Sequence, residues 1–331
     1  MLAPWRKNMR LSVLLLSLFT VAACGKDGED SAVDTSPPED EYPGPFVQVA
    51  AASTYTCGLR ENGTVECWGA PLEEYGQTLP PEGERFTQIS AGTYHACGVT
   101  VDEGSVCWGT PPLDYGQTEP PSAVDFLFVT VGDYHSCGIT TDQNVSCWGD
   151  DSVGQVSDQT SNALQIDAGG NVTCAVTRAG EGDCWGELGD DPDNYMDDGP
   201  FNPSPLSKFT TVTGGPSQFG CGSVNPESKG IECWGRNDNG EAVPPKGLSA
   251  TMMDSGPYHT CGIDKLGNAY CWGLNDVSQT EVPAGEQFTQ LSVGFYHACG
   301  VTPDERVVCW GENFQGQSDP PIDDIPDTGE E

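Results

Sequence analysis

Basic side chains are scarce in this sequence, and histidine is scarcer still. The 331 residues include 13 Lys and Arg against 50 Asp and Glu, with 4 His, which sets the formal net charge at −37 at pH 7. An acidic surface repels phosphate groups, so nucleic acid and anionic membrane surfaces are excluded as expected partners. The acid excess is typical of a protein kept soluble or adapted to salt, and a dedicated basic partner is the alternative.

The chain also lacks an apolar run long enough to cross a bilayer as a helix. The apolar run from Leu11 to Val21 follows three bases, Arg6, Lys7 and Arg10. A short apolar core behind a basic stretch is typical of a signal peptide that is removed on export. We therefore predict a signal peptide over residues 1–23.

A candidate lipidation site follows directly. Residues Val21-Ala22-Ala23-Cys24 resemble the lipobox of bacterial lipoproteins, in which the Cys is lipidated and becomes the first mature residue. An ordinary secretory cleavage site with an unrelated Cys is the alternative. The next residue is Gly25 and not Asp, which in enterobacterial-type sorting favours the outer membrane. The resemblance implies an exported protein of the bacterial cell envelope, attached to the membrane only through the lipid on Cys24.

Two terminal segments have few apolar side chains. Residues 24–45 and 322–331 are acidic and contain Pro. Segments of this composition cannot bury enough surface to offset the entropy of ordering the chain. We predict a disordered acidic tether before the folded region and a disordered acidic tail after it. The folded region is then residues 46–321.

The folded region contains a repeat. The chain has 8 Trp, and seven of them precede a Gly at intervals of 40, 40, 37, 49, 38 and 38 residues. They are Trp68, Trp108, Trp148, Trp185, Trp234, Trp272 and Trp310. Each repeat holds a short aromatic-led strand, a block such as Tyr94-His95-Ala96-Cys97, a turn before the Trp, and in most repeats a Gly-Gln pair after it. Four short strands about every 40 residues predict an all-β, seven-bladed β-propeller.

These residues also carry a family resemblance. The order of aromatic strand, Gly-x-x-His, Val-x-x-Trp-Gly and Gly-Gln resembles the repeat of the regulator of chromosome condensation family. The resemblance covers residues 46–321 and implies a seven-bladed ring. It also implies that a terminal strand near Phe46 completes a blade with the segment that ends near Pro320.

This sequence departs from the repeat pattern of that family in one regular way, because every repeat contains two cysteines. The expected pairs are Cys57 with Cys67, Cys97 with Cys107, Cys137 with Cys147, Cys174 with Cys184, Cys221 with Cys233, Cys261 with Cys271, and Cys299 with Cys309. Zinc sites favour two residues between cysteines, and nine intervene in six of these pairs. We therefore predict one disulfide inside each blade, formed in an oxidising compartment, and no redox role. Cys24 is the one left over.

Hairpin geometry supports this pairing. A three-residue turn from Glu61 to Gly63 places Arg60 opposite Thr64. Counting outward along both strands then places Cys57 opposite Cys67, where the Cβ atoms are close enough for a disulfide. Trp68 is expected on the other face of the blade.

The four histidines occupy one repeat position, at His95, His135, His259 and His297. A ring of equivalent histidines is compatible with a metal or catalytic site. However, no acidic partner recurs beside them, and they match the recurrent His of the family. The resemblance therefore implies that they are structural residues of the blades.

One loop interrupts the regularity. After Trp185-Gly186 the Gly-Gln signal is missing, and five acids cluster in a long insertion. They are Asp190, Asp191, Asp193, Asp197 and Asp198. The alternating order of a calcium loop is absent, so we expect a solvated acidic loop, with a calcium site or a partner-binding loop as alternatives. No cofactor is otherwise expected.

Motifs of hydrolases, metalloproteases and nucleotide-binding enzymes are missing. We therefore predict a monomeric binding scaffold for a protein or other macromolecule, and not an enzyme. Two alternatives stay open at this point. One is an envelope enzyme, carbohydrate-directed for instance, with its site over the central channel. The other is a purely structural component of the envelope.

Overall fold

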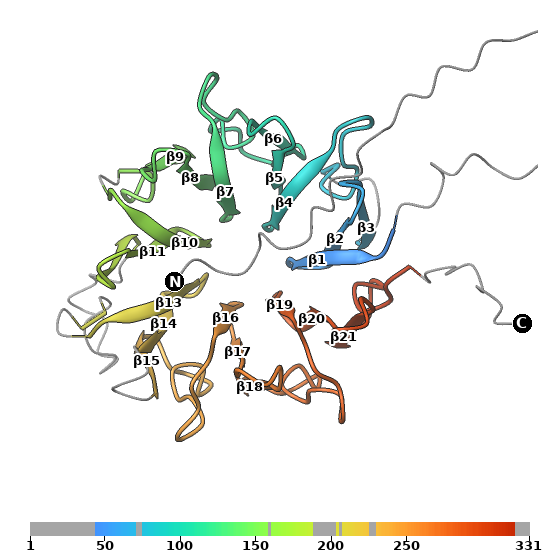
Figure 1. The fold of residues 1–331 in the computed structure, drawn as a ribbon, viewed down its shortest axis with the longest axis vertical. Helices are drawn as coiled ribbons and strands as arrows, with labels where there is room; N and C mark the ends of the chain where they lie inside the picture. Colours follow the sequence, from blue (N-terminus) through green and yellow to red (C-terminus); the bar gives the residue numbers. More distant parts are fainter. Residues whose placement is uncertain are drawn as a thin grey trace, which may run out of the picture. The chain divides into compact units, whose positions relative to one another are not determined.

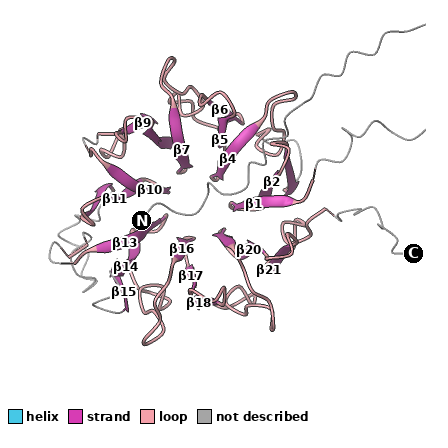
Figure 2. Ribbon diagram, in the orientation of Figure 1, coloured by secondary structure: helices cyan, strands magenta, loops and turns pink. Residues whose placement is uncertain are grey.

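The computed structural model describes residues 44–70, 75–157, 160–187, 203–204, 207–224 and 230–321. Within these ranges every regular element is a β-strand, and the strands form seven separate three-stranded antiparallel sheets. The sheets are arranged as blades around a common centre (Figure 1), with loops and no helix between them (Figure 2). Accordingly, these residues include no helix of the length and apolar character needed to cross a membrane. The prediction of a seven-bladed β-propeller is confirmed.

Each blade is a simple meander of three strands. The first strands, nearest the centre in Figure 1, are β1 (Phe46–Ala51), β4 (Phe86–Ala91), β7 (Phe126–Val131), β10 (Ala163–Gly169), β13 (Phe209–Gly215), β16 (Met252–Ser255) and β19 (Gln290–Val293). The middle strands are β2 (Tyr55–Arg60), β5 (Ala96–Thr100), β8 (His135–Thr140), β11 (Val172–Thr177), β14 (Phe219–Val224), β17 (His259–Ile263) and β20 (His297–Val301). The outer strands are β3 (Val65–Gly69), β6 (Ser105–Trp108), β9 (Val145–Gly149), β12 (Gly182–Gly186), β15 (Gly230–Gly235), β18 (Ala269–Gly273) and β21 (Val307–Gly311).

The prediction of a fourth strand in each repeat is wrong. The Gly-Gln segments, such as Gly76-Gln77 and Gly116-Gln117, are turns and not strands. The Gln77 carbonyl accepts a hydrogen bond from the indole N–H of Trp108 in the next blade, at 2.9 Å. The Gln117 carbonyl accepts the same bond from Trp148, also at 2.9 Å. The segment contacts the next blade through the hydrogen bond to this one carbonyl, and it does not pair with that blade as a β-strand.

The ring is closed by the same contact. The Gln317 carbonyl, in the last repeat, accepts hydrogen bonds from Trp68 Nε1 and from Thr56 Oγ1 of blade one, each at 3.0 Å. Blade one therefore combines the N-terminal strand β1 with the C-terminal Gly-Gln segment. The expected pairing of the terminal strand with this segment is wrong, because β1 pairs with β2 of its own blade and the Gln317 carbonyl is bonded by side chains of β2 and β3.

The backbone conformation after the Trp of each repeat explains why the next residue is Gly. In all seven repeats the Gly that follows Trp has a positive φ, for example 89° at Gly69 and 115° at Gly109. Left-handed backbone is strained for residues with a Cβ. A Cβ at Gly109 would also lie only 2.7 Å from the Tyr94 carbonyl oxygen. Glycine is thus required where each outer strand passes the loop before the middle strand.

The disulfides join directly opposed residues of the middle and outer strands, one in each blade. Cys57 pairs with Cys67 in the strand register, and the Arg60 N–H donates to the Thr64 carbonyl at 2.8 Å. The register counted outward from the turn is therefore confirmed. In blade five the separation is 12 residues instead of 10, and opposition survives because both numbers are even.

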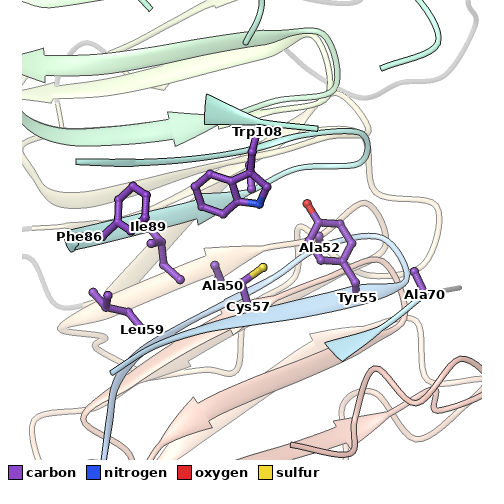
Figure 3. Close-up of a cluster of buried hydrophobic side chains, with 10 residues drawn as sticks. Ala50, Ala52, Tyr55, Cys57, Leu59, Ala70, Phe86, Ile89 and Trp108 are labelled. Atoms are coloured by element: carbon purple, nitrogen blue, oxygen red, sulfur yellow. The ribbon is translucent and has the colours of Figure 1, made fainter. Parts of the chain in front are cut away.

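The hydrophobic core lies between neighbouring blades. Figure 3 shows the junction of blades one and two, where Cys57 and Leu59 face Phe86 and Trp108. Trp68 lies on the other face of blade one and packs against the disulfide side of blade seven. Each blade thus presents its disulfide to the following blade and its Trp to the preceding one. This explains why Cys and Trp are adjacent in the sequence, since adjacent strand residues point to opposite faces.

Among the buried side chains at the Gly-Gln position, Gln279 Nε2 has no hydrogen-bond partner, and Glu241, the one acid there, also has an atom without one. Glu241 is fully buried, and its Oε2 accepts the Asn239 N–H at 2.6 Å, whereas Oε1 has no hydrogen-bond partner. Five other repeats carry Gln at this position. In blade two, Gln117 Oε1 accepts the Tyr115 N–H at 2.7 Å, and Nε2 donates to the Leu113 carbonyl at 2.7 Å.

We expect Glu241→Gln to stabilise the protein by about 1 kcal/mol, because it removes a buried, unpaired carboxylate oxygen. Thermal unfolding followed by calorimetry measures the change. The matched reverse substitution, Gln117→Glu, should lower the melting temperature. A lower melting temperature for Glu241→Gln would contradict the expectation.

Candidate functional site

One end of the propeller is lined by tyrosines. The loops that join the first and middle strands carry Tyr94, Tyr134, Tyr258 and Tyr296, each just before the recurrent His. Blades one, four and five have Thr54, Asn171 and Gln218 there. We call this end the tyrosine face and the opposite end, where the middle and outer strands are joined, the hairpin face.

In blades two and three the rings form a row. Tyr94 and Tyr134 lie with ring centroids 5.0 Å apart and planes tilted by 30°. Tyr75 contacts Tyr94 edge-on at 5.6 Å, and Tyr115 contacts Tyr134 edge-on at 5.8 Å. These offset and edge-on arrangements are favourable for aromatic pairs. Tyr115 is 47% exposed, so the row reaches the surface.

Blades six and seven repeat the central pair of this row. Tyr258 and Tyr296 are stacked with centroids 5.1 Å apart and planes at 19°. Burial, a hydrogen bond with Tyr258, and the nearby carboxylates of Glu312 and Asp276 raise the pKa of Tyr296 to about 12. Burial, the hydrogen bond with Tyr94 and the charge of Asp133 likewise raise the pKa of Tyr134. Tyr134 and Tyr296 are thus neutral phenols at physiological pH, with carboxylates close by.

Bases are nearly absent from this face. The structure describes eight Lys and Arg side chains, and Arg236 is the one among them on the tyrosine face. Arg236 lies in blade five and forms an ion pair with Asp238. The other seven lie at the hairpin face or in the segment that leads back to it: Arg60, Arg85, Arg178, Lys208, Lys246, Lys265 and Arg306. Seven of the eight described bases therefore lie toward one end of the ring.

The histidines lie in the blade junctions below the tyrosines. All four are fully buried, and three donate from Nε2 to a hydroxyl of the next blade at 2.8 Å. The histidine is the donor, because the Ser136 hydroxyl already donates its hydrogen to the Gln117 carbonyl at 3.1 Å and can only accept from His95. Burial lowers the pKa of His95, His259 and His297 to about 3 and that of His135 to about 4. These histidines are neutral parts of the junctions, as the resemblance implied.

His259 is the exception among them. Both of its ring nitrogens are buried without a hydrogen-bond partner. The residue that faces His95 across the next junction is Ser136, and the corresponding residue for His259 is Ala298. The orphaned nitrogen therefore results from the loss of one hydroxyl in blade seven.

We expect Ala298→Ser to stabilise the protein by about 1 kcal/mol, because Nε2 of His259 gains an acceptor. For a ring of this size the melting temperature should rise by about 2–4 °C. Calorimetry measures the shift. Ser136→Ala is the matched control, which orphans His95 and should lower the melting temperature, and equal behaviour of the two variants would refute the assignment.

Two inner-strand carboxylates also bridge blades. Asp167 Oδ2 accepts from Thr213 Oγ1 and the Gly214 N–H, both at 2.9 Å. Asp254 Oδ2 accepts from Ser292 Oγ at 3.0 Å and the Val293 N–H at 2.7 Å. Burial raises the pKa of both, that of Asp254 to about 7 with help from the Asp167 charge. Their hydrogen bonds to the neighbouring strands identify them as junction residues.

The predicted loop site cannot be placed. Asp190, Asp191, Asp193, Asp197 and Asp198 lie outside the described residues, as does Cys24. In the ranges that are described, no three His, Cys, Asp or Glu side chains come together in a group that could hold a metal ion. The tyrosine face was missed from the sequence. Its signal was present, because Tyr precedes His in all four His-containing repeats.

Comparison with known proteins agrees with the fold. Three segments, residues 128–155, 253–279 and 288–317, match the model of the Regulator of chromosome condensation (RCC1) repeat. The CRINKLY WD40 ectodomain of the Arabidopsis thaliana receptor kinase ACR4 is similar at 25% identity and a TM-score of 0.65, over 82% of this chain and 98% of that one.

Two further solved structures share the fold. The ectodomain of the Physcomitrella patens receptor kinase CR4 matches at 23% identity and a TM-score of 0.65, over 81% of this chain and 74% of that one. Human WBSCR16 matches at 18% identity and a TM-score of 0.62, over 79% of this chain and 88% of that one. The chain is therefore a seven-bladed, disulfide-linked β-propeller that carries repeats of the regulator of chromosome condensation type.

Proposed function

We propose that this protein is an exported scaffold that binds another protein through its tyrosine face. The tyrosine row of blades two and three carries the proposal. Tyrosine is enriched in protein interfaces because it offers a large apolar ring with a polar tip and few rotatable bonds. The row ends in Tyr115, which is 47% exposed, and Leu113, two residues before it in the chain, is 51% exposed. A ring held by seven disulfides presents such a surface with little loss of conformational entropy on binding.

The seven disulfides support a place outside the cytoplasm, where an oxidising environment keeps cystines intact. A similar propeller in the ACR4 ectodomain supports the same kind of location. Within this proposal the protein is a monomer anchored in the bacterial outer membrane by the lipid on Cys24. The anchor is a separate claim from the binding face.

The binding claim is tested by crosslinking on intact cells. We expect the full-length protein to yield a specific crosslinked partner, and the double variant Tyr94→Leu, Tyr134→Leu to lose it. Asp102→Asn with Asp142→Asn, exposed positions on the hairpin face of the same blades, is the control and should keep the partner. A partner that survives the tyrosine substitutions would overturn the proposal.

The anchor is tested by labelling with a fatty-acid analogue. The wild-type protein should incorporate the label and sediment with membranes. Cys24→Ala should lose the label and appear in the soluble fraction after export. Labelling that persists in Cys24→Ala would contradict the anchor.

A further inference from the structure

We infer that the partner of the tyrosine face is a basic polypeptide segment rich in arginine or lysine. This inference rests on the proposed function and names the chemistry of the partner. It follows from three features of the same surface. These are the tyrosine pairs, the carboxylates beside them, and the distribution of bases in the molecule.

The tyrosine pairs lie on both sides of blade one. Tyr258 and Tyr296 belong to blades six and seven, and Tyr94 and Tyr134 to blades two and three. Blade one carries the small residue Thr54 between them. An aromatic ring attracts a cation through its electron-rich face, and arginine stacks on such faces most often. Two pairs separated by a small residue provide two places for cationic side chains of one extended segment.

Carboxylates accompany both pairs. Asp133 directly precedes Tyr134 and accepts a hydrogen bond from Thr93 Oγ1 at 2.6 Å. The Glu312 N–H donates to the Tyr296 carbonyl at 2.8 Å, and Asp276 is close enough to affect the pKa of Tyr296. Asp150 follows Trp148-Gly149 on this face, and its N–H donates to the Tyr134 carbonyl at 2.9 Å. A carboxylate next to an aromatic ring can form an ion pair with the same cation that the ring attracts.

The bases of the molecule are absent from this part of the surface. In blades six, seven, one, two and three, every described Lys and Arg lies at the hairpin face: Arg60, Arg85, Lys265 and Arg306. An acidic partner would therefore meet uncompensated carboxylates at the tyrosine face, which is unfavourable, whereas a basic one would meet complementary charge. The net charge of −37 attracts a basic segment at long range, and the face gives it a defined place.

Peptide titrations on the full-length protein test the inference. The probes are three twelve-residue peptides that alternate Gly with Arg, with the neutral isostere citrulline, or with Glu. We expect the Arg peptide to bind more tightly than the other two. Its affinity should fall as salt is raised, because exposed charges are screened.

Matched variants separate the face from simple charge attraction. Tyr94→Leu with Tyr134→Leu should weaken the Arg peptide about tenfold, as the loss of two cation–π contacts implies, whereas Tyr94→Phe with Tyr134→Phe should keep most of the affinity. Asp114, which directly precedes Tyr115, and Asp276 are exposed carboxylates of the tyrosine face. Asp114→Asn with Asp276→Asn should weaken binding of the Arg peptide more than Asp102→Asn with Asp142→Asn, which removes the same charge from the hairpin face. The melting temperature of every variant shows that it is folded.

Two results would overturn the inference. One is equal binding of the Arg and citrulline peptides, and the other is an equal loss in the two charge-neutralised variants. If the Arg peptide fails but the crosslinked partner is lost with the tyrosines, the proposed function stands and its partner is not basic. If neither depends on the tyrosines, both proposals fail.

Discussion

Reduction of the seven disulfides is expected to unfold the propeller at 25 °C. Each bridge closes a short loop, with a sequence separation of 10 residues in blade three, for example. In the chain-entropy model such a loop contributes roughly 2–3 kcal/mol, so seven contribute on the order of 14–21 kcal/mol if they add. A whole domain is usually stable by only about 5–15 kcal/mol. The reduced chain should therefore lose its fold.

Circular dichroism and tryptophan fluorescence, with and without a phosphine reductant, measure this effect. A single bridge should matter far less. Cys137→Ala with Cys147→Ala should leave the ring folded and lower its stability by about 2–3 kcal/mol. A fully reduced protein that keeps its native spectrum would show that blade packing alone holds the ring together.

Acid is expected to destabilise the folded protein strongly. Burial lowers the pKa of His95, His259 and His297 from 6.5 to about 3, and that of His135 to about 4. Their stabilising contribution is complete above pH 6.5 and is lost as the pH falls, because the unfolded chain then binds protons that the folded chain cannot. At pH 4 the free energy of unfolding should be lower by roughly 3 kcal/mol for each histidine.

Asp254 acts in the opposite direction. Its folded pKa is raised to about 7 from 3.8, so unfolding releases its proton between these values and the folded state gains stability as the pH falls. This offsets the loss of unfolding free energy from about one histidine, roughly 3 kcal/mol. Burial also raises the pKa of Asp167, which acts in the same direction. The net result should still be a marked loss of stability between pH 6.5 and pH 4.

Urea unfolding at a series of pH values measures the net proton uptake. His259→Phe is the most direct variant, since blade five already holds Phe219 at this position and His259 has no hydrogen bond to lose. It should remove one proton from the uptake. His135→Val copies Val172 of blade four and should do the same, with the loss of one hydrogen bond to Thr173. Stability that stays constant from pH 7 to pH 4 would contradict the buried, neutral state of the histidines.

Much of the fold could be predicted because the same sequence pattern occurs seven times, and each copy supports the same blade structure. One hairpin is ambiguous, but the spacing of Cys57 and Cys67 recurs in six of the seven blades with the same even interval. The side-chain period of a strand is two, so the spacing determined both the register and the face of each disulfide. The position of Trp68 on the opposite face followed from the same count.

The prediction of a fourth strand was wrong because the conformation of the Gly-Gln segment is decided by contacts outside the repeat. A Gly-Gln pair is compatible with an extended segment or with a turn. The choice depends on the neighbouring blade, whose Trp indole and buried hydroxyl both need one carbonyl, as Trp68 and Thr56 need that of Gln317. The partner Trp lies in another repeat, 31 positions from Gln77 and 249 positions from Gln317 at the ring closure.

For the tyrosine face, too, some features were determined by the sequence and others only by the tertiary structure. Sequence alone determined that Tyr precedes His in four repeats, that the chain is strongly acidic, and that every blade contains a cystine, because periodicity and composition are properties of the chain itself. Only the tertiary structure decided that the rings of Tyr94 and Tyr134 meet across a blade junction, and that seven of the eight described bases lie toward the other end of the strands. Ring closure places residues of different repeats side by side, and distance along the sequence does not report that proximity.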